Sequence, residues 1–248
     1  GFHHFFFQKC WTTLAPSITK YILDAYALNP LPLGVNDTLI YLIPKTDQPN
    51  TLNQFRPIGL CNSSYKILAK VLVNKLRPVL ASIISPFQSS FIPSRSGTDN
   101  VILVQEAIHR INRKKGKWEV CAIKLDLHKA YDHLEWDFIK QVLHFFEFLT
   151  TTISLIIHCI SSTRFAILHN GAPSLDFVPS KGIRQGDPLS PYIFILCMEY
   201  LSLFINQEVE DKRWKPLQFG RTSHSLSHCL FADDIILFSS TDVQSINA

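Results

Sequence analysis

Apolar and polar residues alternate in two segments of the chain, a pattern typical of β-strands whose two faces differ. The first segment, DTLIYLIPK (37–45), alternates up to Pro44. The second is EVCAIKLDL (119–127). One face would carry Cys121, Ile123, Leu125 and Leu127, and the other Val120, Ala122, Lys124 and Asp126. Both segments are predicted strands.

Helical spacing of apolar residues marks the segment 62–84, NSSYKILAKVLVNKLRPVLASII. A Ser or Asn precedes the apolar stripe as a cap, and Lys66, Lys70 and Arg77 lie off it on a polar face. Pro78 predicts a kink or the start of a second segment. The stripe consists of Leu68, Val71, Leu72, Leu76, Val79 and Leu80. Similar spacings predict further helices at 101–112, 136–146, 152–160 and 190–206.

Turn-forming residues separate these elements. Ser, Pro and Gly make 85–100 a predicted loop, and KKGK (114–117) a predicted turn. A hairpin pair is expected around 164–182, and HCLFADDIILF (228–238) is expected to form a second hairpin. The loop GIRQGDPLSP leads into the helix near 190, with Pro191 suited to its first turn. Helices come first and hairpins last, so the predicted class is α+β with an antiparallel sheet.

Composition limits the type of protein. An apolar content of 46% and a charged content of 18% exclude a disordered tail. The longest apolar stretch, 190–205, is short for a bilayer and carries Glu199, so a buried helix is expected and no membrane partner. The N-terminal residues show no signal-peptide pattern and no initiating Met, so the chain is expected to be an excerpt.

Cysteine and histidine give little indication of a metal or redox site. The six cysteines are scattered singly, without a CxxC pair, which suits a reducing compartment. His224 and His228 have i, i+4 spacing, but no third ligand lies near them in the sequence. A loop flanking a strand is the favoured interpretation of this pair.

Charge is distributed unevenly along the chain. Residues 56–117 hold 11 Lys and Arg against 2 acidic residues, a net of +9. The remaining 13 basic and 18 acidic residues give a net of −5. This asymmetry indicates a polyanionic partner for the first half, although a solvated basic face is the alternative.

Three carboxylates are expected at the ends of apolar strands: Asp126, Asp233 and Asp234. Unneutralised carboxylates in such places would be costly, and Mg²⁺ with its preference for carboxylate and water ligands removes the difficulty. The alternative is that Asp233 and Asp234 merely form a polar hairpin turn. Two-residue turns prefer Asn-Gly or Asp-Gly, whereas Ile235 follows here, which weakens that alternative.

Six ordered blocks resemble reverse transcriptases, in particular those of plant non-LTR retrotransposons of the long interspersed element type. They cover nearly the whole chain, and together they are far more specific than any one of them. The blocks are LIPK (42–45), FRPIGLCNSSYKILAKVLVNKLRPVL (55–80), QSSFIPSR…DN (88–100), KLDLHKAYDHLEWDF (124–138), GIRQGDPLSPYIF (182–194) and FADD (231–234).

The resemblance implies a right-hand polymerase with fingers and palm, in which an antiparallel palm sheet packs on helices. It implies an N-terminal extension at 1–36, fingers at 37–118 with further contributions near 160–185, and a palm at 119–248. Asp126, Asp233 and Asp234 would be the catalytic carboxylates that bind two Mg²⁺ ions, with Mn²⁺ as an alternative ion.

The resemblance also implies roles for nucleotide-binding residues. Tyr131 would be the aromatic steric gate against a ribose 2′-OH, with core packing as its alternative role. Gln185 and Gly186 would lie beside the incoming nucleotide, and Arg56 would face the template and triphosphate. Lys66 and Arg95 are weaker candidates for template or primer contacts. Lys124, on the strand face of Asp126, is equally well explained as an ion-pair partner.

The implied activity is RNA-directed DNA synthesis with an RNA template, a DNA primer and deoxynucleoside triphosphates as partners. A viral-type RNA-dependent RNA polymerase is one alternative, and a truncated or decayed copy that binds nucleic acid without catalysis is another. An intracellular location, in cytoplasm and nucleus, is expected from the family. The sequence does not indicate an oligomeric state.

Some residues depart from the family pattern. Ser94 stands where a Gly usually precedes the Arg95 position, and HFFEFLTTTISL (144–155) lacks a usual Gly, which suggests a degenerate copy. Because only 14 residues follow Asp234, the primer-grip hairpin and thumb are expected to be missing, as is any upstream endonuclease.

Overall fold

A computed structural model of the chain describes residues 2–93, 95–113, 120–219, 224–242 and 245. Ser94 and the predicted turn at 114–117 lie outside these residues. The chain divides into two compact units. The first unit is made of Gly1–Leu76 and Tyr131–Ser190, and the second of Arg77–Ala130 and Pro191–Ala248. These boundaries differ from the predicted ones, and the division into extension, fingers and palm stays a prediction.

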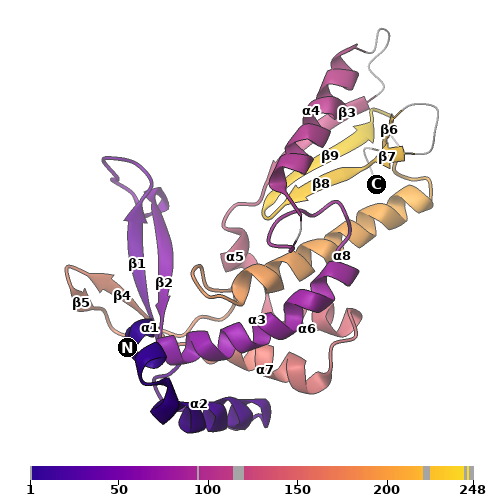
Figure 1. Cartoon of the computed structure of the whole chain (residues 1–248). Coiled ribbons are helices and arrows are strands. Elements are labelled where there is room, and N and C mark those ends of the chain that lie inside the picture. The colour runs from indigo at the N-terminus through magenta and orange to yellow at the C-terminus, as the bar shows by residue number, and fades with distance from the viewer. Residues whose placement is uncertain (1, 94, 114–119, 220–223, 243–244, 246–248) are drawn as a thin grey trace. The chain divides into compact units, whose positions relative to one another are not determined.

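The first unit contains a four-stranded sheet in the order β2-β1-β4-β5. β1 and β2 form a long antiparallel hairpin that is easily followed in Figure 1, with Thr38 opposite Cys61 and Pro44 opposite Phe55. β1 also pairs with β4 in parallel, so the expectation of a purely antiparallel sheet is wrong for this unit. The strands are β1 (Thr38–Pro44), β2 (Phe55–Cys61), β4 (Phe165–His169) and β5 (Ala172–Pro173), and the 3-10 turn η1 (Leu52–Gln54) precedes β2.

Helices supply the core of the first unit. The helix predicted at 136–146 is confirmed as α6, which buries Ile139, Val142 and Leu143. Leu68 and Leu72 of α3 are buried, as their spacing predicted, and so is Tyr65, which lay outside the predicted stripe; Val79 of the stripe is exposed, so the prediction is wrong there. The helices are α1 (His4–Lys9), α2 (Trp11–Tyr26), the first part of α3 (Ser63–Ile83), most of α5 (Ala130–His133), α6 (Trp136–Phe145) and α7 (Thr150–Ser161).

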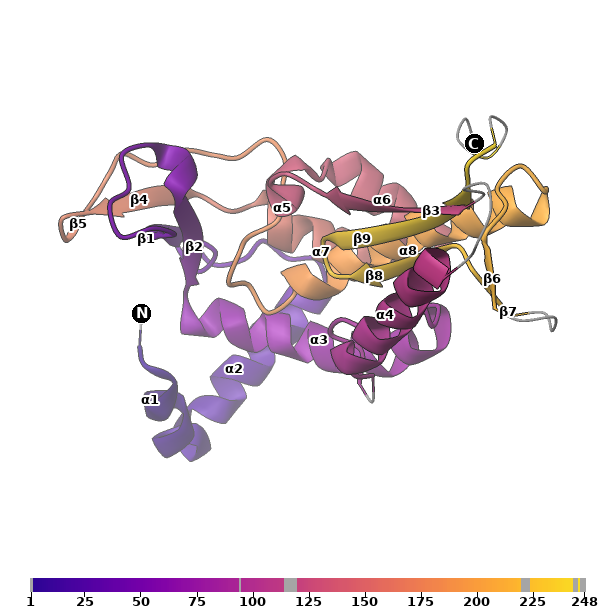
Figure 2. The same cartoon turned by 90° about the horizontal axis from the view of Figure 1, so that it is seen from above.

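The second unit contains an antiparallel sheet in the order β3-β9-β8. Figures 1 and 2 both show α4 running along β8, and the two elements are in contact. A core of Ala107, Leu217, Leu226, Cys229 and Phe238 joins α4 to these strands and to the β6–β7 hairpin. The elements are α4 (Gly97–Arg113), β3 (Val120–Asp126), α8 (Ser190–Glu210), β6 (Leu217–Phe219), β7 (His224–Leu226), β8 (His228–Phe231) and β9 (Asp234–Ser240).

The long apolar helix α8 begins at Ser190 and carries Pro191 in its first turn, as predicted. By length and composition alone it could cross a membrane, but half of its most apolar window is buried within the protein. Glu199 in its middle is fully buried. These features are those of the core helix that the sequence predicted.

Two predicted elements differ in extent. α4 begins at Gly97 rather than 101, which shortens the expected loop. α3 continues through Pro78, so no second segment starts there, and a kink at Pro78 stays a prediction. The second strand of the hairpin at 164–182 is reduced to β5 and a single bridge between Phe165 and Phe177. The hairpin at 228–238 is confirmed.

Candidate functional site

The predicted carboxylates come together at one end of the β3-β9-β8 sheet. Asp126, the last residue of β3, lies directly opposite Asp234, the first residue of β9. Asp234 also pairs with Phe231 of β8, so the loop between the two strands consists of Ala232 and Asp233 alone. The strand register therefore places all three carboxylates around a single two-residue turn.

The turn itself has an unusual backbone. Ala232 has a φ of 53°, in the left-handed region that favours glycine. Residues with a Cβ are strained there, and such strain persists only where the surrounding structure enforces it. Asp233 and Asp234 do not form the turn as a pair, because Asp234 already belongs to β9. The simple polar-turn interpretation is therefore wrong in its geometry.

Solvent reaches all three carboxylates, since Asp126, Asp233 and Asp234 are exposed. β8 and β9, which flank Asp233, are largely buried as expected, whereas most of β3 is exposed. Lys124 Nζ lies 3.0 Å from Asp234 Oδ1, which confirms its role as an ion-pair partner. This hydrogen bond to Asp234 raises the pKa of the Lys124 ammonium.

The three aspartates offer the type of ligand atom that Mg²⁺ prefers. Carboxylate oxygens are its preferred protein ligands, and Mg²⁺ usually takes one or two carboxylates together with substrate phosphates and water. Asp126 and Asp234 stand opposite each other and so can supply two such oxygens. Among the described residues no cluster of three or more His, Cys, Asp or Glu side chains is preassembled for an ion.

His228 does not take part in a metal site. Its Nε2 lies 2.7 Å from Ser202 Oγ and its Nδ1 lies 2.9 Å from Ser227 Oγ, so both ring nitrogens have hydrogen-bond partners. The ring is fully buried, and burial lowers the pKa of His228 to about 4. It is a neutral core histidine at the start of β8.

The first unit holds the predicted nucleotide-binding residues Arg56, Tyr131, Gln185 and Gly186. The loop of GIRQGDP lies against β2, where the backbone N–H of Gly59 donates to the carbonyl of Gln185 at 2.7 Å. Gly186 has a φ of 101°, and a Cβ there would lie 2.7 Å from the Gly59 carbonyl oxygen. Only glycine permits this approach.

A buried ion pair anchors the same loop. Arg184 Nη2 donates to Asp187 Oδ2 at 2.7 Å, and both side chains are almost fully buried. Arg184 also donates to Asn36 Oδ1 and to the Cys159 carbonyl, while the Tyr65 hydroxyl donates to Asp187 at 2.6 Å. Burial, and then the Asp187 carboxylate, raise the pKa of Tyr65 well above its usual value, so the hydroxyl stays protonated. This network fixes the loop from its buried side.

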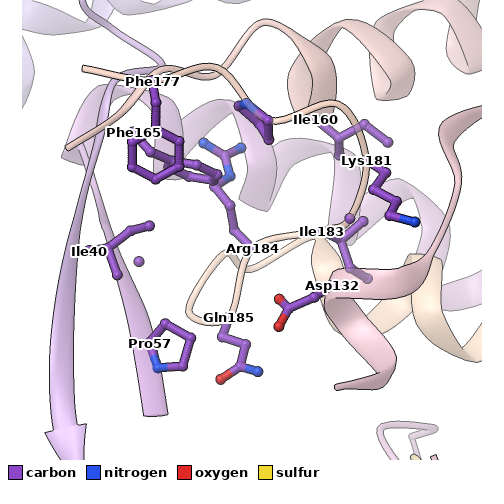
Figure 3. A pocket seen from close by; sticks show the side chains of 13 residues that line it. Ile40, Pro57, Asp132, Ile160, Phe165, Phe177, Lys181, Ile183, Arg184 and Gln185 are labelled. Carbon is purple, nitrogen blue, oxygen red and sulfur yellow. The ribbon is translucent and has the colours of Figure 1, made fainter. Parts of the chain in front are cut away.

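Next to this loop lies a pocket of about 240 Å³. Figure 3 shows Phe165 and Phe177 on one side of the pocket, Asp132 and Lys181 on the other, and Gln185 at the edge. The carbonyl of Tyr131 accepts a hydrogen bond from the Ile183 N–H at 2.9 Å, which ties the proposed gate residue to the loop. Arg56 lies on β2 opposite Ile43 and is exposed.

The two weaker candidates have different surroundings. Lys66 is half-buried on α3. Arg95 donates from Nη1 to the Ser85 and Gln88 carbonyls and from Nη2 to the Ile84 carbonyl, at 2.5, 2.7 and 2.6 Å. These bonds organise the segment after α3, so the geometry favours a structural task for Arg95. Its contact with template or primer stays a prediction.

Sequence reasoning gave no role to the buried polar residues Gln88, Asn100, Arg184 and Asp187. All four lie within the blocks that carry the resemblance, QSSFIPSR…DN and GIRQGDP. No local pattern marks them, because each has a hydrogen-bond partner that lies more than 100 residues away in the sequence.

The family model described as "Reverse transcriptase (RNA-dependent DNA polymerase)" matches residues 43–248. The chain belongs to the reverse transcriptase family. The resemblance to reverse transcriptases of non-LTR retrotransposons is confirmed by relatives of this kind.

Two curated relatives illustrate the match. The chain is 28% identical over 94% of its length to the Transposon TX1 uncharacterized 149 kDa protein of Xenopus laevis. It is 27% identical over 85% of its length to the Pol polyprotein of the type-2 retrotransposable element R2DM of Drosophila melanogaster. The matches span 17% and 19% of these two proteins.

Solved structures show the same fold. Telomerase from Candida tropicalis, truncated from its C-terminal domain, has a TM-score of 0.53 and 15% identity, covering 96% of this chain and 50% of the telomerase chain. Telomerase from the same yeast in complex with a telomeric RNA fragment has a TM-score of 0.54 and 16% identity, covering 96% and 41%. The α+β polymerase fold predicted from the sequence is confirmed.

Proposed function

We propose that this chain is the catalytic reverse transcriptase domain of a retrotransposon protein and copies RNA into DNA. The observation that carries the proposal is the register that sets Asp126 opposite Asp234, beside the Ala232-Asp233 turn, in a chain of this family. The partners would be an RNA template, a DNA primer and deoxynucleoside triphosphates. The protein would act inside the cell, in cytoplasm and nucleus.

The reaction joins the primer 3′ oxygen to the α-phosphorus of a nucleotide and breaks the bond to the β-phosphate, so pyrophosphate leaves. Asp126, Asp233 and Asp234 would hold two Mg²⁺ ions, which supply charge neutralisation at the phosphate oxygens and activation of the attacking hydroxyl. Mn²⁺ could take their place.

Residues of the first unit would bind and select the nucleotide. Arg56, exposed on β2, would donate charge-assisted hydrogen bonds to the triphosphate. The Gln185-Gly186 backbone would lie beside the nucleotide, held against Gly59 by its hydrogen bond. Tyr131 would exclude a ribose 2′-OH by crowding.

Primer extension on an RNA template tests the proposal, with the full-length protein that contains this chain. Asp233→Asn should reduce extension by at least about 1,000-fold, because the substitution removes a charged ligand at constant volume. Asp137→Asn, an exposed carboxylate in the first turn of α6, serves as the matched control and should leave extension unchanged.

Three results would count against the proposal. Full activity of Asp233→Asn would exclude the two-metal assignment. Preference of the unsubstituted protein for ribonucleotides would favour an RNA-dependent RNA polymerase. Tight binding of template–primer without any extension would favour the binding-only alternative.

A further inference from the structure

Behind the carboxylate turn lies a buried glutamine from a different part of the chain. Gln88, in the segment between α3 and α4, is fully buried. Its Oε1 accepts a hydrogen bond from the backbone N–H of Ala232 at 3.3 Å and another from the N–H of Ser90 at 3.0 Å. The side chain thus touches the backbone of the residue that precedes Asp233.

The orientation of this amide follows from its partners. Both neighbouring groups are N–H donors, so the amide oxygen must face them. The opposite atom, Gln88 Nε2, is buried and has no hydrogen-bond partner among the described residues. A buried donor without a partner costs stability. An apolar residue of similar size would remove that cost, but it would leave the N–H groups of Ala232 and Ser90 without this acceptor.

The segment between α3 and α4 also forms backbone contacts with the outer edge of β8. Gln88 forms a parallel bridge with Leu230, and the Leu230 N–H donates to the Phe87 carbonyl at 2.8 Å. From α4, Asn100 Nδ2 donates to the Leu230 carbonyl at 2.9 Å. In the strand that leads into the turn, both the N–H and the carbonyl of Leu230 are therefore hydrogen-bonded.

Arg95 and Gly97 complete this support. The guanidinium of Arg95 binds the carbonyls of Ile84, Ser85 and Gln88, which fixes the backbone that carries the glutamine. At Gly97 an added Cβ would lie 2.6 Å from the Phe231 ring, so the first turn of α4 packs closely on the residue before Ala232. The contacts converge on the strained turn from the loop and from α4.

We propose that Gln88 is a positioning residue for catalysis, which fixes the Asp233 carboxylate by holding the Ala232 N–H. The inference rests on the proposed function, since it assigns Gln88 a task in the same carboxylate site. A strained, exposed turn that carries adjacent carboxylates needs such support, because groups that bind metal must be held in place by surrounding residues. Asn100 and Arg95 act further back, on the strand and on the loop.

Gln88→Met tests the proposal in the full-length protein. It keeps the volume and removes the unpartnered Nε2, but it leaves the N–H groups of Ala232 and Ser90 without this acceptor, so the melting temperature should fall modestly and activity is compared per folded protein. The catalytic rate should fall about 10- to 100-fold while KM for deoxynucleotides stays the same. The affinity for Mn²⁺ without nucleotide, measured by electron paramagnetic resonance, should fall as well. Gln207→Met, an exposed position on α8, is the matched control.

A second variant separates positioning from packing. Gln88→Glu retains an acceptor oxygen toward Ala232 and should recover part of the rate, per folded protein, that Gln88→Met loses, while burial of its carboxyl group lowers the melting temperature. The proposal is overturned if Gln88→Met leaves the rate and the Mn²⁺ affinity unchanged, or if its loss of activity only follows a loss of folded protein. If Asp233→Asn remains active, the proposed carboxylate site is itself wrong. If Asp233→Asn is inactive but Gln88→Met is fully active, only the role of Gln88 is wrong.

Discussion

At the scale of single residues, the buried ion pair of Arg184 and Asp187 shows how the loop GIRQGDP (182–188) is fixed. Both side chains are almost inaccessible to solvent, and Tyr65 and Asn36 satisfy further hydrogen-bonding groups around them. A guanidinium left alone in such a place is strongly destabilising, whereas the intact pair need not add net stability. The pair therefore specifies the loop conformation more than it stabilises the fold.

Asp187→Ala should lower the free energy of unfolding by about 3–5 kcal/mol, because it leaves the Arg184 charge buried without its partner. Urea denaturation measures this loss. Adding Arg184→Met to the same protein should recover part of it. Lys181→Ala breaks an exposed pair with Glu135 and should cost less than about 1 kcal/mol. Equal losses in Asp187→Ala and Lys181→Ala would contradict the structural role of the buried pair.

At the scale of elements, periodicity predicted those strands and helices whose own residues alternate or recur at helical spacing. β1, β3, α3, α6 and α7 belong to this group. β2 was not predicted as a strand because FRPIGLC contains Pro57 and Gly59, and it forms through pairing with β1. The helices α1 and α2 were not predicted either, and α2 contains Pro16. Such elements depend on partners that a local pattern does not contain.

The sequence predicted which residues form the carboxylate site, but not what surrounds them. Strand ends and the resemblance together selected Asp126, Asp233 and Asp234, and the register brings them together. Burial of the carboxylates, which motivated the metal argument, is absent in the structure: all three side chains are exposed, although β8 and β9 are largely buried. The contacts of Gln88 and Asn100 join segments more than 100 residues apart, at separations of 144 and 130, so sequence spacing could not reveal them.

A buried polar chain between α8 and β8 makes the second unit sensitive to acid. Burial holds the pKa of His228 at about 4, below the value near 6.5 of an exposed histidine. As pH falls, the unfolded chain therefore binds a proton before the folded chain does. Through His228, the free energy of unfolding should decrease between about pH 6.5 and pH 4, by on the order of 3 kcal/mol.

Urea denaturation at several pH values measures this effect, with His228→Gln as the comparison. The variant should show a smaller decrease in that window. Glu199 acts with the opposite sign, because burial raises the pKa of its carboxyl, so its protonation favours the folded state as the pH falls. Glu199→Gln removes that contribution. An unchanged pH slope in His228→Gln would show that another group is responsible.

At the scale of the whole molecule, charge is the property that bears on the partner. The net of +9 in residues 56–117 contrasts with −5 elsewhere, and copying requires a grip that ignores base sequence. Contacts to phosphates give such a grip, since they neutralise backbone charge and release counterions. Lys66 and Lys70 lie within the basic segment, on α3.

Joint substitution Lys66→Gln and Lys70→Gln should weaken binding of an RNA–DNA template–primer to a similar extent for every sequence tested. If both side chains contact phosphates, the slope of log affinity against log salt should become shallower by about 2, one for each contact. Fluorescence anisotropy from low to moderate salt measures the slope. Lys140→Gln, an exposed lysine of α6 outside the basic segment, should leave it unchanged. An unaltered slope in the double variant would mean that the basic segment is a solvated face, and the grip on the template would then have to come from other residues.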